Sequence, residues 1–154
     1  MGVITDFMSQ DHDRLDGLFS EFQATKRSDL SHAKQCFREF NGGLQRHIVW
    51  EEEVLFPLFE RQTGMQDHGP TAVMRAEHRR IHHALDQIHE RIAKGDTPND
   101  ALEEELIALL APHNQKEESI LYPWIDQSLS EQQAEATRAK MVGMPSEHFT
   151  RCCG

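Results

Sequence analysis

The sequence has little positive charge, and this shortage limits what the protein can bind. Of its 154 residues, 16 are Lys or Arg and 26 are Asp or Glu, which leaves a formal net charge of −10. Proteins that bind nucleic acid or anionic lipid usually present a basic stripe or patch. We therefore expect this chain to bind neither nucleic acid nor a membrane surface.

Long apolar runs and paired cysteines are also missing. The mean hydropathy is −0.64, and no apolar run approaches the roughly 18 residues of a membrane span. The N-terminus lacks the basic and then apolar stretches of a secretory signal. Three cysteines, Cys36, Cys152 and Cys153, do not make a disulfide framework, so the expected location is a reducing cytoplasm.

Apolar residues recur at intervals of three and four along nearly the whole chain, which predicts helices. Four long amphipathic segments with short connections are typical of an all-α, up-down four-helix bundle. We expect this bundle to occupy residues 1–128. Residues 129–154 are expected to form a short C-terminal helix and a tail, with the helix over about 131–142 behind a capping box made by Ser130 and Gln133.

Three prolines fall inside the expected long helices: Pro57, Pro112 and Pro123. A proline has no N–H to donate and its ring clashes with the preceding turn. Kinks or early helix ends are therefore expected at these positions.

The second half of the chain repeats the first at an offset of 66 residues. The segment 47–57 aligns with 113–123, and 11–15 aligns with 77–81. In each half, 35 residues separate the first histidine of the repeat from the second. A helical hairpin duplicated in this way can pack about a two-fold axis, which brings equivalent residues face to face.

Seven ionisable residues lie on the apolar stripes, at positions where leucine is expected in a purely structural bundle. They are His12, His47, Glu51, His78, His82, His113 and Glu117. Unpaired, each such group costs several kcal/mol to bury. Side chains four residues apart on a helix are separated by about 6 Å along the axis and can reach one point. Imidazole and carboxylate together suit iron, manganese or zinc, and two carboxylates from facing helices can bridge two ions.

On these residues, and on the flanking Leu-Phe-Pro and Leu-Tyr-Pro, the chain resembles the hemerythrin-like (HHE, cation-binding) domains over about residues 5–127. The resemblance implies a four-helix bundle around two iron ions, an oxo- or hydroxo-bridged non-heme di-iron centre. Carried over by position, His78, His82 and His113 hold one iron and His12 and His47 hold the other. Glu51 and Glu117 bridge them.

The last motif departs from that of the marine-worm oxygen carriers. Those proteins have HxxxxD, whereas this chain has His113-x-x-x-Glu117, which is similar to the bacterial branch of the family. Members of that branch are linked to binding or sensing of dioxygen or nitric oxide, to repair of iron centres and to peroxide chemistry. The resemblance therefore implies the metal site more closely than the role.

Two classes of function stay open at this point. The first is a binding protein, in which the di-iron centre takes up dioxygen or nitric oxide as carrier, store or sensor. The second is an oxidoreductase acting on nitric oxide or peroxide, and iron supply to damaged iron centres is a third possibility. The ligand count favours binding, because one iron is filled while the other, on the His12 and His47 side, is one ligand short.

Four neighbours of the predicted site are expected to take no direct part in metal binding. Glu52 and Glu118 are expected to be rim charges, and Trp50 and Tyr122 to be core packing. His82 is the one predicted ligand that breaks the repeat, because its counterpart in the first half is Asp16.

Overall fold

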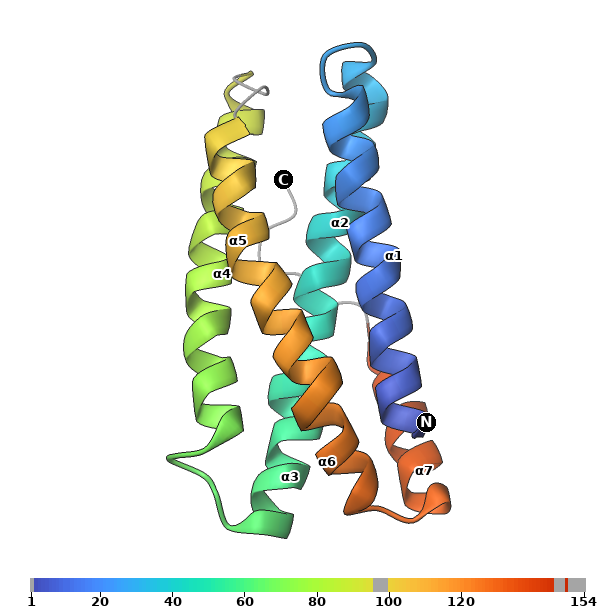
Figure 1. Cartoon of the computed structure of the whole chain (residues 1–154). Coiled ribbons are helices and arrows are strands. Elements are labelled where there is room, and N and C mark those ends of the chain that lie inside the picture. The colour runs from blue at the N-terminus through green and yellow to red at the C-terminus, as the bar shows by residue number, and fades with distance from the viewer. Residues whose placement is uncertain (1, 96–99, 146–148, 150–154) are drawn as a thin grey trace.

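The computed structural model describes residues 2–95, 100–145 and 149 of the chain (Figure 1). All the regular structure in these ranges is helical, so the predicted all-α fold is confirmed. The long helices are α1 (Val3–Thr25), α2 (Leu30–Trp50), α4 (Pro70–Ala93) and α5 (Asp100–Lys116). They run alternately up and down the bundle, and α7 (Glu131–Val142) lies beside the N-terminal end of α1 (Figure 1).

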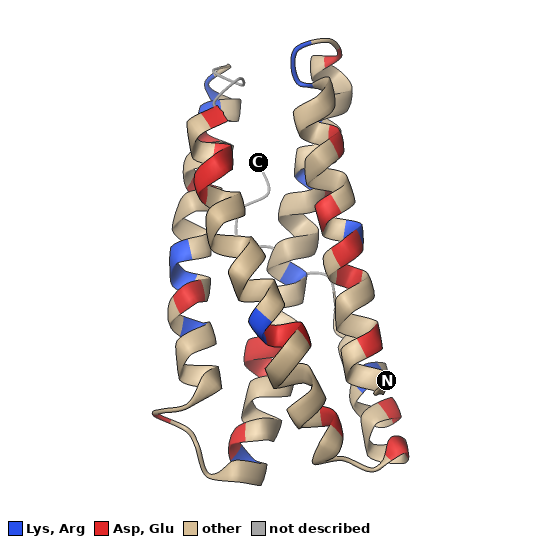
Figure 2. Ribbon diagram, viewed as in Figure 1, with Lys and Arg blue, Asp and Glu red and all other residues tan. Residues whose placement is uncertain are grey.

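The packing follows the repeat. Helix α1 packs along α2, and α4 packs along α5, so each half of the chain forms one hairpin. Within the described ranges, no helix combines the length and the apolar character needed to cross a membrane. Figure 2 shows Lys and Arg scattered among Asp and Glu on this side of the described chain, without a continuous basic stripe.

The second and fourth long helices each pass through a π-helical turn. Helix α2 continues through η1 (Glu51–Leu55) into α3 (Phe56–Thr63), and α5 continues through η2 (Glu117–Leu121) into α6 (Tyr122–Gln127). Each π turn begins at one of the two predicted bridging carboxylates. Such turns are rare and are found frequently at functional sites.

A π turn ends two residues before Pro57 and another two residues before Pro123, where kinks or early helix ends are expected. The N–H just before each proline reaches back five residues, from Phe56 to the carbonyl of Glu51 and, in the second half, from Tyr122 to that of Glu117. The wider turn lets the chain stay helical up to the proline, which has no backbone N–H to donate. At Pro112 the expected early end is wrong, because α5 continues through it to Lys116.

Several helix ends agree with the sequence signals. Asp29 caps α2 by accepting from the His32 N–H at 3.2 Å, and Gly64 ends α3 with a φ of 76° that favours glycine. Ser130 and Gln133 form the predicted capping box of α7, which spans the predicted residues. The pair Cys152 and Cys153 lies outside the described residues.

Two apolar layers fill the bundle, one on each side of a polar layer. The layer toward the α1–α2 connection contains Phe22, Phe40 and Leu106. The layer toward α7 contains Phe56 and Tyr122, both fully buried. The predicted metal ligands lie between these layers, at the level of the π turns.

A buried ion pair joins the two hairpins at the end of the bundle away from α7. Lys26 is 4% exposed and Glu103 is 1% exposed. The Lys26 Nζ donates to Oε1 and Oε2 of Glu103 at 2.7 and 2.8 Å, and Gln23 donates to the same carboxylate at 3.1 Å. The sequence pattern did not indicate this contact.

We predict that Glu103→Ala destabilises the protein by roughly 1–3 kcal/mol, because the buried Lys26 ammonium then keeps only the exposed Asp100 as a carboxylate partner. The adjacent exposed Glu104→Ala is the matched control and is expected to change stability by less than about 0.5 kcal/mol. Urea unfolding of both variants measures the difference. Equal free energies of unfolding would show that the pair contributes nothing.

Candidate metal centre

Six of the seven predicted ligands meet in the middle of the bundle. Each is at most 3% exposed. They form two groups whose candidate ligand atoms all lie within 4.8 Å of one another: Glu51, His78, His113 and Glu117 in one, and His12, His47 and Glu117 in the other. Glu117 belongs to both groups, as a residue shared by two ions does.

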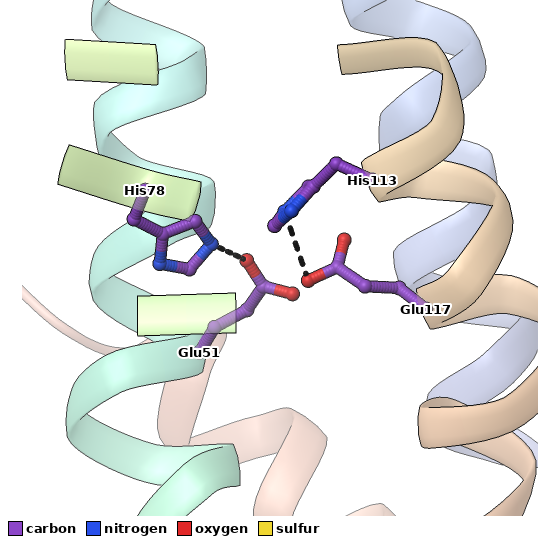
Figure 3. Close-up of side chains that lie close together, drawn as sticks. All are labelled: Glu51, His78, His113 and Glu117. Carbon is purple, nitrogen blue, oxygen red and sulfur yellow. Dashed lines mark ion pairs between the residues drawn. The ribbon is translucent and has the colours of Figure 1, made fainter. Parts of the chain in front are cut away.

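In the first group the side chains converge from facing helices, as Figure 3 shows. His78 Nε2 lies 3.1 Å from Oε1 of Glu51, and His113 Nε2 lies 3.2 Å from Oε2 of Glu117. These are the nitrogens and oxygens that face the interior, so the group offers two imidazoles and two carboxylates to a single point.

The second group lies beside the first, on the α1 side. His12 Nε2 lies 3.3 Å from Oε1 of Glu117, and His47 Nε2 lies 3.8 Å from Oε1 of Glu51. The His12 and His47 rings are 4.6 Å apart between centroids. Both rings therefore direct Nε2 at the carboxylates that the first group also uses.

A carboxylate holds the outer nitrogen of each of these four histidines. The Nδ1–carboxylate pairs are His12–Glu118 at 2.7 Å, His78–Glu52 at 2.7 Å, His47–Asp11 at 2.9 Å and His113–Glu77 at 2.8 Å. The first two pairs are related by the 66-residue repeat, and so are the last two. Such a carboxylate fixes the ring orientation and leaves Nε2 with its lone pair toward a metal.

The sequence analysis missed this function of the carboxylates. Glu52 and Glu118 are indeed at the rim, 34% and 38% exposed, but each also orients a buried histidine. Asp11 and Glu77 also hold histidines, and each directly precedes a predicted ligand in the sequence. Their equivalent places in the repeat could have indicated this role.

Tyr122 is more than core packing. Its hydroxyl is buried at the centre of the second group and donates to Oε2 of Glu51 at 2.7 Å, with Oε1 of Glu117 at 3.1 Å. It also lies 3.2 Å from His47 Nε2 and 3.4 Å from His12 Nε2. The repeat contained a signal, because the equivalent residue is Phe56 and a hydroxyl on a core stripe must find partners.

His82 does not join either group. It is half-buried and lines a cavity of about 440 Å³ together with Ile48, Glu52 and His78. The ligand role predicted for it therefore stays a prediction.

A cavity of about 390 Å³ occupies the equivalent place in the other half of the bundle. It is lined by Asp16, Asn114 and Glu118, the counterparts of His82, Ile48 and Glu52. One cavity thus reaches the carboxylate that holds His78, and the other reaches the carboxylate that holds His12.

Burial and mutual contact shift the pKa values at the centre. Burial, and then the charge of Glu117, raise the pKa of Glu51. Burial would lower the pKa of His12, but Glu117 and Glu51 outweigh it and raise that pKa to about 9. The pKa of His78 is raised against burial to about 10 by Glu51 and Glu52. Without metal, protons supply the positive charge that the carboxylates need, and metal binding must displace them.

Three buried polar atoms at the centre lack a hydrogen-bond partner among the described residues: Glu51 Oε1, His78 Nε2 and Glu117 Oε2. Such atoms are costly unless something else binds them. Two of them, His78 Nε2 and Glu51 Oε1, lie 3.1 Å apart as an ion pair, and Glu117 Oε2 lies 3.2 Å from His113 Nε2. Imidazole nitrogen and carboxylate oxygen brought together in this way suit a transition metal such as iron. The residues present therefore fit a metal ion.

Comparison with known proteins gives one family and a set of bacterial relatives. The family described as Hemerythrin HHE cation binding domain matches residues 3–125. The iron-sulfur cluster repair protein YtfE of Yersinia pestis (strain Pestoides F) is 32% identical over 89 residues, and YtfE of Edwardsiella ictaluri (strain 93-146) is 35% identical over 89 residues. The match covers 52% of this chain and 40% of either relative, so the chain spans less than half the length of these relatives. No solved structure matches significantly.

We predict that Glu52→Gln weakens iron(II) binding by roughly 10- to 100-fold, because His78 loses the carboxylate that orients its ring. The matched control is Glu53→Gln, the same change at the adjacent exposed residue, which is expected to leave the affinity unchanged. Anaerobic titration with a competing chelator measures both affinities. If the two variants bind iron equally, the contact from Glu52 to His78 does not support the site.

Proposed function

The chain belongs to the hemerythrin HHE cation-binding family, and from this we propose that its buried centre holds two iron ions and binds dioxygen or nitric oxide. The observation that carries the proposal is the polar layer itself. Four imidazoles and two carboxylates lie buried between two apolar layers, and three of their atoms have no hydrogen-bond partner among the described residues.

We assign one iron to His78 and His113 and the other to His12 and His47, with Glu51 and Glu117 shared between them. The two clusters of ligand atoms support this division of the histidines and the sharing of Glu117. The 3.8 Å distance between His47 Nε2 and Glu51 Oε1 supports the sharing of Glu51. We also keep His82 as a ligand of the first iron, supported by the cavity that it lines next to His78. The iron on the His12 side then has one position fewer filled by protein.

When bound, iron would supply the chemistry, which is either reversible binding of a diatomic molecule or its reduction. The protein orients the ligands and excludes water. Four carboxylates each hold one imidazole ring in its orientation; they belong to Asp11, Glu52, Glu77 and Glu118. The two apolar layers exclude water on either side of the centre, which strengthens each electrostatic contact within it.

The Tyr122 hydroxyl donates to Glu51 Oε2 in this structure, and it would become a donor for a small ligand on the His12 side once iron takes that carboxylate oxygen. It lies within 3.4 Å of both His12 Nε2 and His47 Nε2. The first half has no counterpart, because the equivalent residue is Phe56. A single fixed donor on one side favours a ligand that accepts a hydrogen bond at that side.

Iron supply to damaged iron centres is the second candidate. The observation that favours it is the likeness to relatives named iron-sulfur cluster repair protein. An oxidoreductase acting on nitric oxide or peroxide is the third. Release of iron distinguishes iron supply from the other two candidates. Catalytic turnover of nitric oxide or peroxide distinguishes the oxidoreductase from the binding protein.

The primary test is metal analysis with anaerobic spectroscopy. We expect close to two irons per chain, a reduced protein that changes its visible spectrum on exposure to oxygen or nitric oxide, and recovery of the first spectrum after the gas is removed. One iron or none per chain contradicts the site. Consumption of the gas without recovery favours the enzyme, and transfer of iron to an apo iron-sulfur protein favours supply.

We predict that Tyr122→Phe keeps the iron and releases nitric oxide roughly tenfold faster, since one hydrogen bond to a ligand in a buried site contributes up to about 1.5 kcal/mol. Phenylalanine already occupies the equivalent core position at Phe56, so the ring is expected to fit. Stopped-flow release from the iron-loaded protein gives the rate, and iron content and thermal unfolding check that the centre is intact. An unchanged rate would leave Tyr122 without a role in ligand binding.

We predict that His82→Leu lowers iron affinity by roughly 10- to 100-fold and shortens the lifetime of the oxygen-bound state, because a position opens on the first iron. His83→Leu, at the exposed neighbour, is the matched control and is expected to behave as wild type. Identical iron content, spectra and lifetimes in all three proteins would show that His82 is not a ligand.

A further inference from the structure

A third cavity lies between α1, α2 and α7, outside the metal centre. Its volume is about 530 Å³, and its walls include Phe7, Trp50 and Met141 together with Asp11, Arg14 and Arg46. Pockets of this size, mostly apolar with a few convergent charged groups, are typical of small-molecule sites. We propose that this cavity binds a small anion in which a carboxylate or phosphate is attached to an apolar ring.

The charged wall has more positive than negative groups. Arg14 forms a close pair with Asp11, with Nε and Nη2 at 3.0 and 2.9 Å from Oδ1. Arg46 stands further off, with Nη2 at 3.7 Å from the same oxygen. The other oxygen of Asp11 is engaged by His47. Two guanidinium groups thus share one carboxylate that is already occupied.

Arg46 has hydrogen-bonding capacity left over. Its Nε is buried without a hydrogen-bond partner among the described residues. Its Nη2 lies 3.7 Å from Asp11 Oδ1, beyond hydrogen-bond distance, on a side chain that is 36% exposed. A guanidinium presents donors in a planar fork that matches a carboxylate or phosphate. An anion in the cavity would give Arg46 the partner that Asp11 cannot provide.

The apolar wall is rigid and aromatic. The Arg46 guanidinium lies over the Trp50 ring, 4.7 Å from its centroid, and the Phe7 ring is 5.2 Å from that of Trp50. The Trp50 indole N–H donates to the Met141 carbonyl at 2.8 Å, which fixes the ring and leaves it no donor for a ligand. The ring of the anion would pack against these faces while its charged end reaches Arg46.

The cavity is one contact away from the proposed iron site. Asp11 Oδ2 holds His47 Nδ1 at 2.9 Å, and the Nε2 of that histidine faces the centre. A ligand that attracts Arg46 changes the charge around Asp11 and thereby the environment of His47. The cavity itself contains no proposed iron ligand, so binding there does not require iron.

Titration calorimetry with the full chain tests the proposal, using benzoate, phenyl phosphate, benzyl alcohol and inorganic phosphate as probes. We expect one site per chain for benzoate or phenyl phosphate, and the stronger of the two shows which anion is preferred. Benzyl alcohol and inorganic phosphate are expected to bind at least about tenfold more weakly, because each lacks one half of the recognised structure. The proposal is wrong if benzyl alcohol binds as tightly as benzoate, or if inorganic phosphate binds as tightly as phenyl phosphate. It is also wrong if no probe binds.

Two further arms separate this site from the metal centre. Arg46→Gln is expected to weaken benzoate binding by at least about tenfold, whereas Arg38→Gln, at an exposed arginine on the same helix, is expected to leave it unchanged. Circular dichroism checks that both variants fold. Benzoate is also expected to bind after the iron has been removed with a chelator. Loss of binding on iron removal, or equal affinities in the two arginine variants, would overturn the proposal, and neither result bears on whether the centre holds iron.

Discussion

The structure depends on one electrostatic constraint, the burial of two carboxylates side by side in the core. Glu51 and Glu117 are fully buried between apolar layers. Two such groups repel, and each loses its hydration, so positive charge has to be supplied from within the bundle. The carboxylates raise the pKa values of His12 and His78 against the effect of burial, which favours protonated rings there when no metal is bound. Metal ions supply the same charge more compactly and also satisfy the unpartnered atoms.

The rest of the centre follows from holding that charge in place. Each histidine gives its outer nitrogen to a carboxylate at or near the surface, and its inner nitrogen to the centre. Negative charge therefore surrounds the positive layer on both sides, which helps to explain an acidic chain built around a cation site. The π turns begin at Glu51 and Glu117 themselves and end two residues before Pro57 and Pro123. Each bridge candidate and the proline after it therefore belong to the same local departure from α-helix.

Two of the differences between the repeated halves lie at or beside the centre. Tyr122 stands where the first half has Phe56, and His82 stands where it has Asp16. The hydroxyl is on the side of His12 and His47, whereas His82 is on the side of His78. The two groups of candidate ligands therefore differ in their surroundings even though their histidines are related by duplication.

The sequence by itself determined the helices, the repeat and the polar residues on the apolar stripes, because helical periodicity and burial cost are local properties that a single chain displays. The six buried ligand candidates could be named in this way. Only the tertiary structure decided which carboxylate holds which ring, that Tyr122 points its hydroxyl into the centre, and that His82 lies in a cavity beside it. Those outcomes depend on how far each helix is rotated and shifted against its neighbours. Side-chain contacts between residues such as His12 and Glu118, 106 positions apart, are set by that packing and not by spacing along the chain.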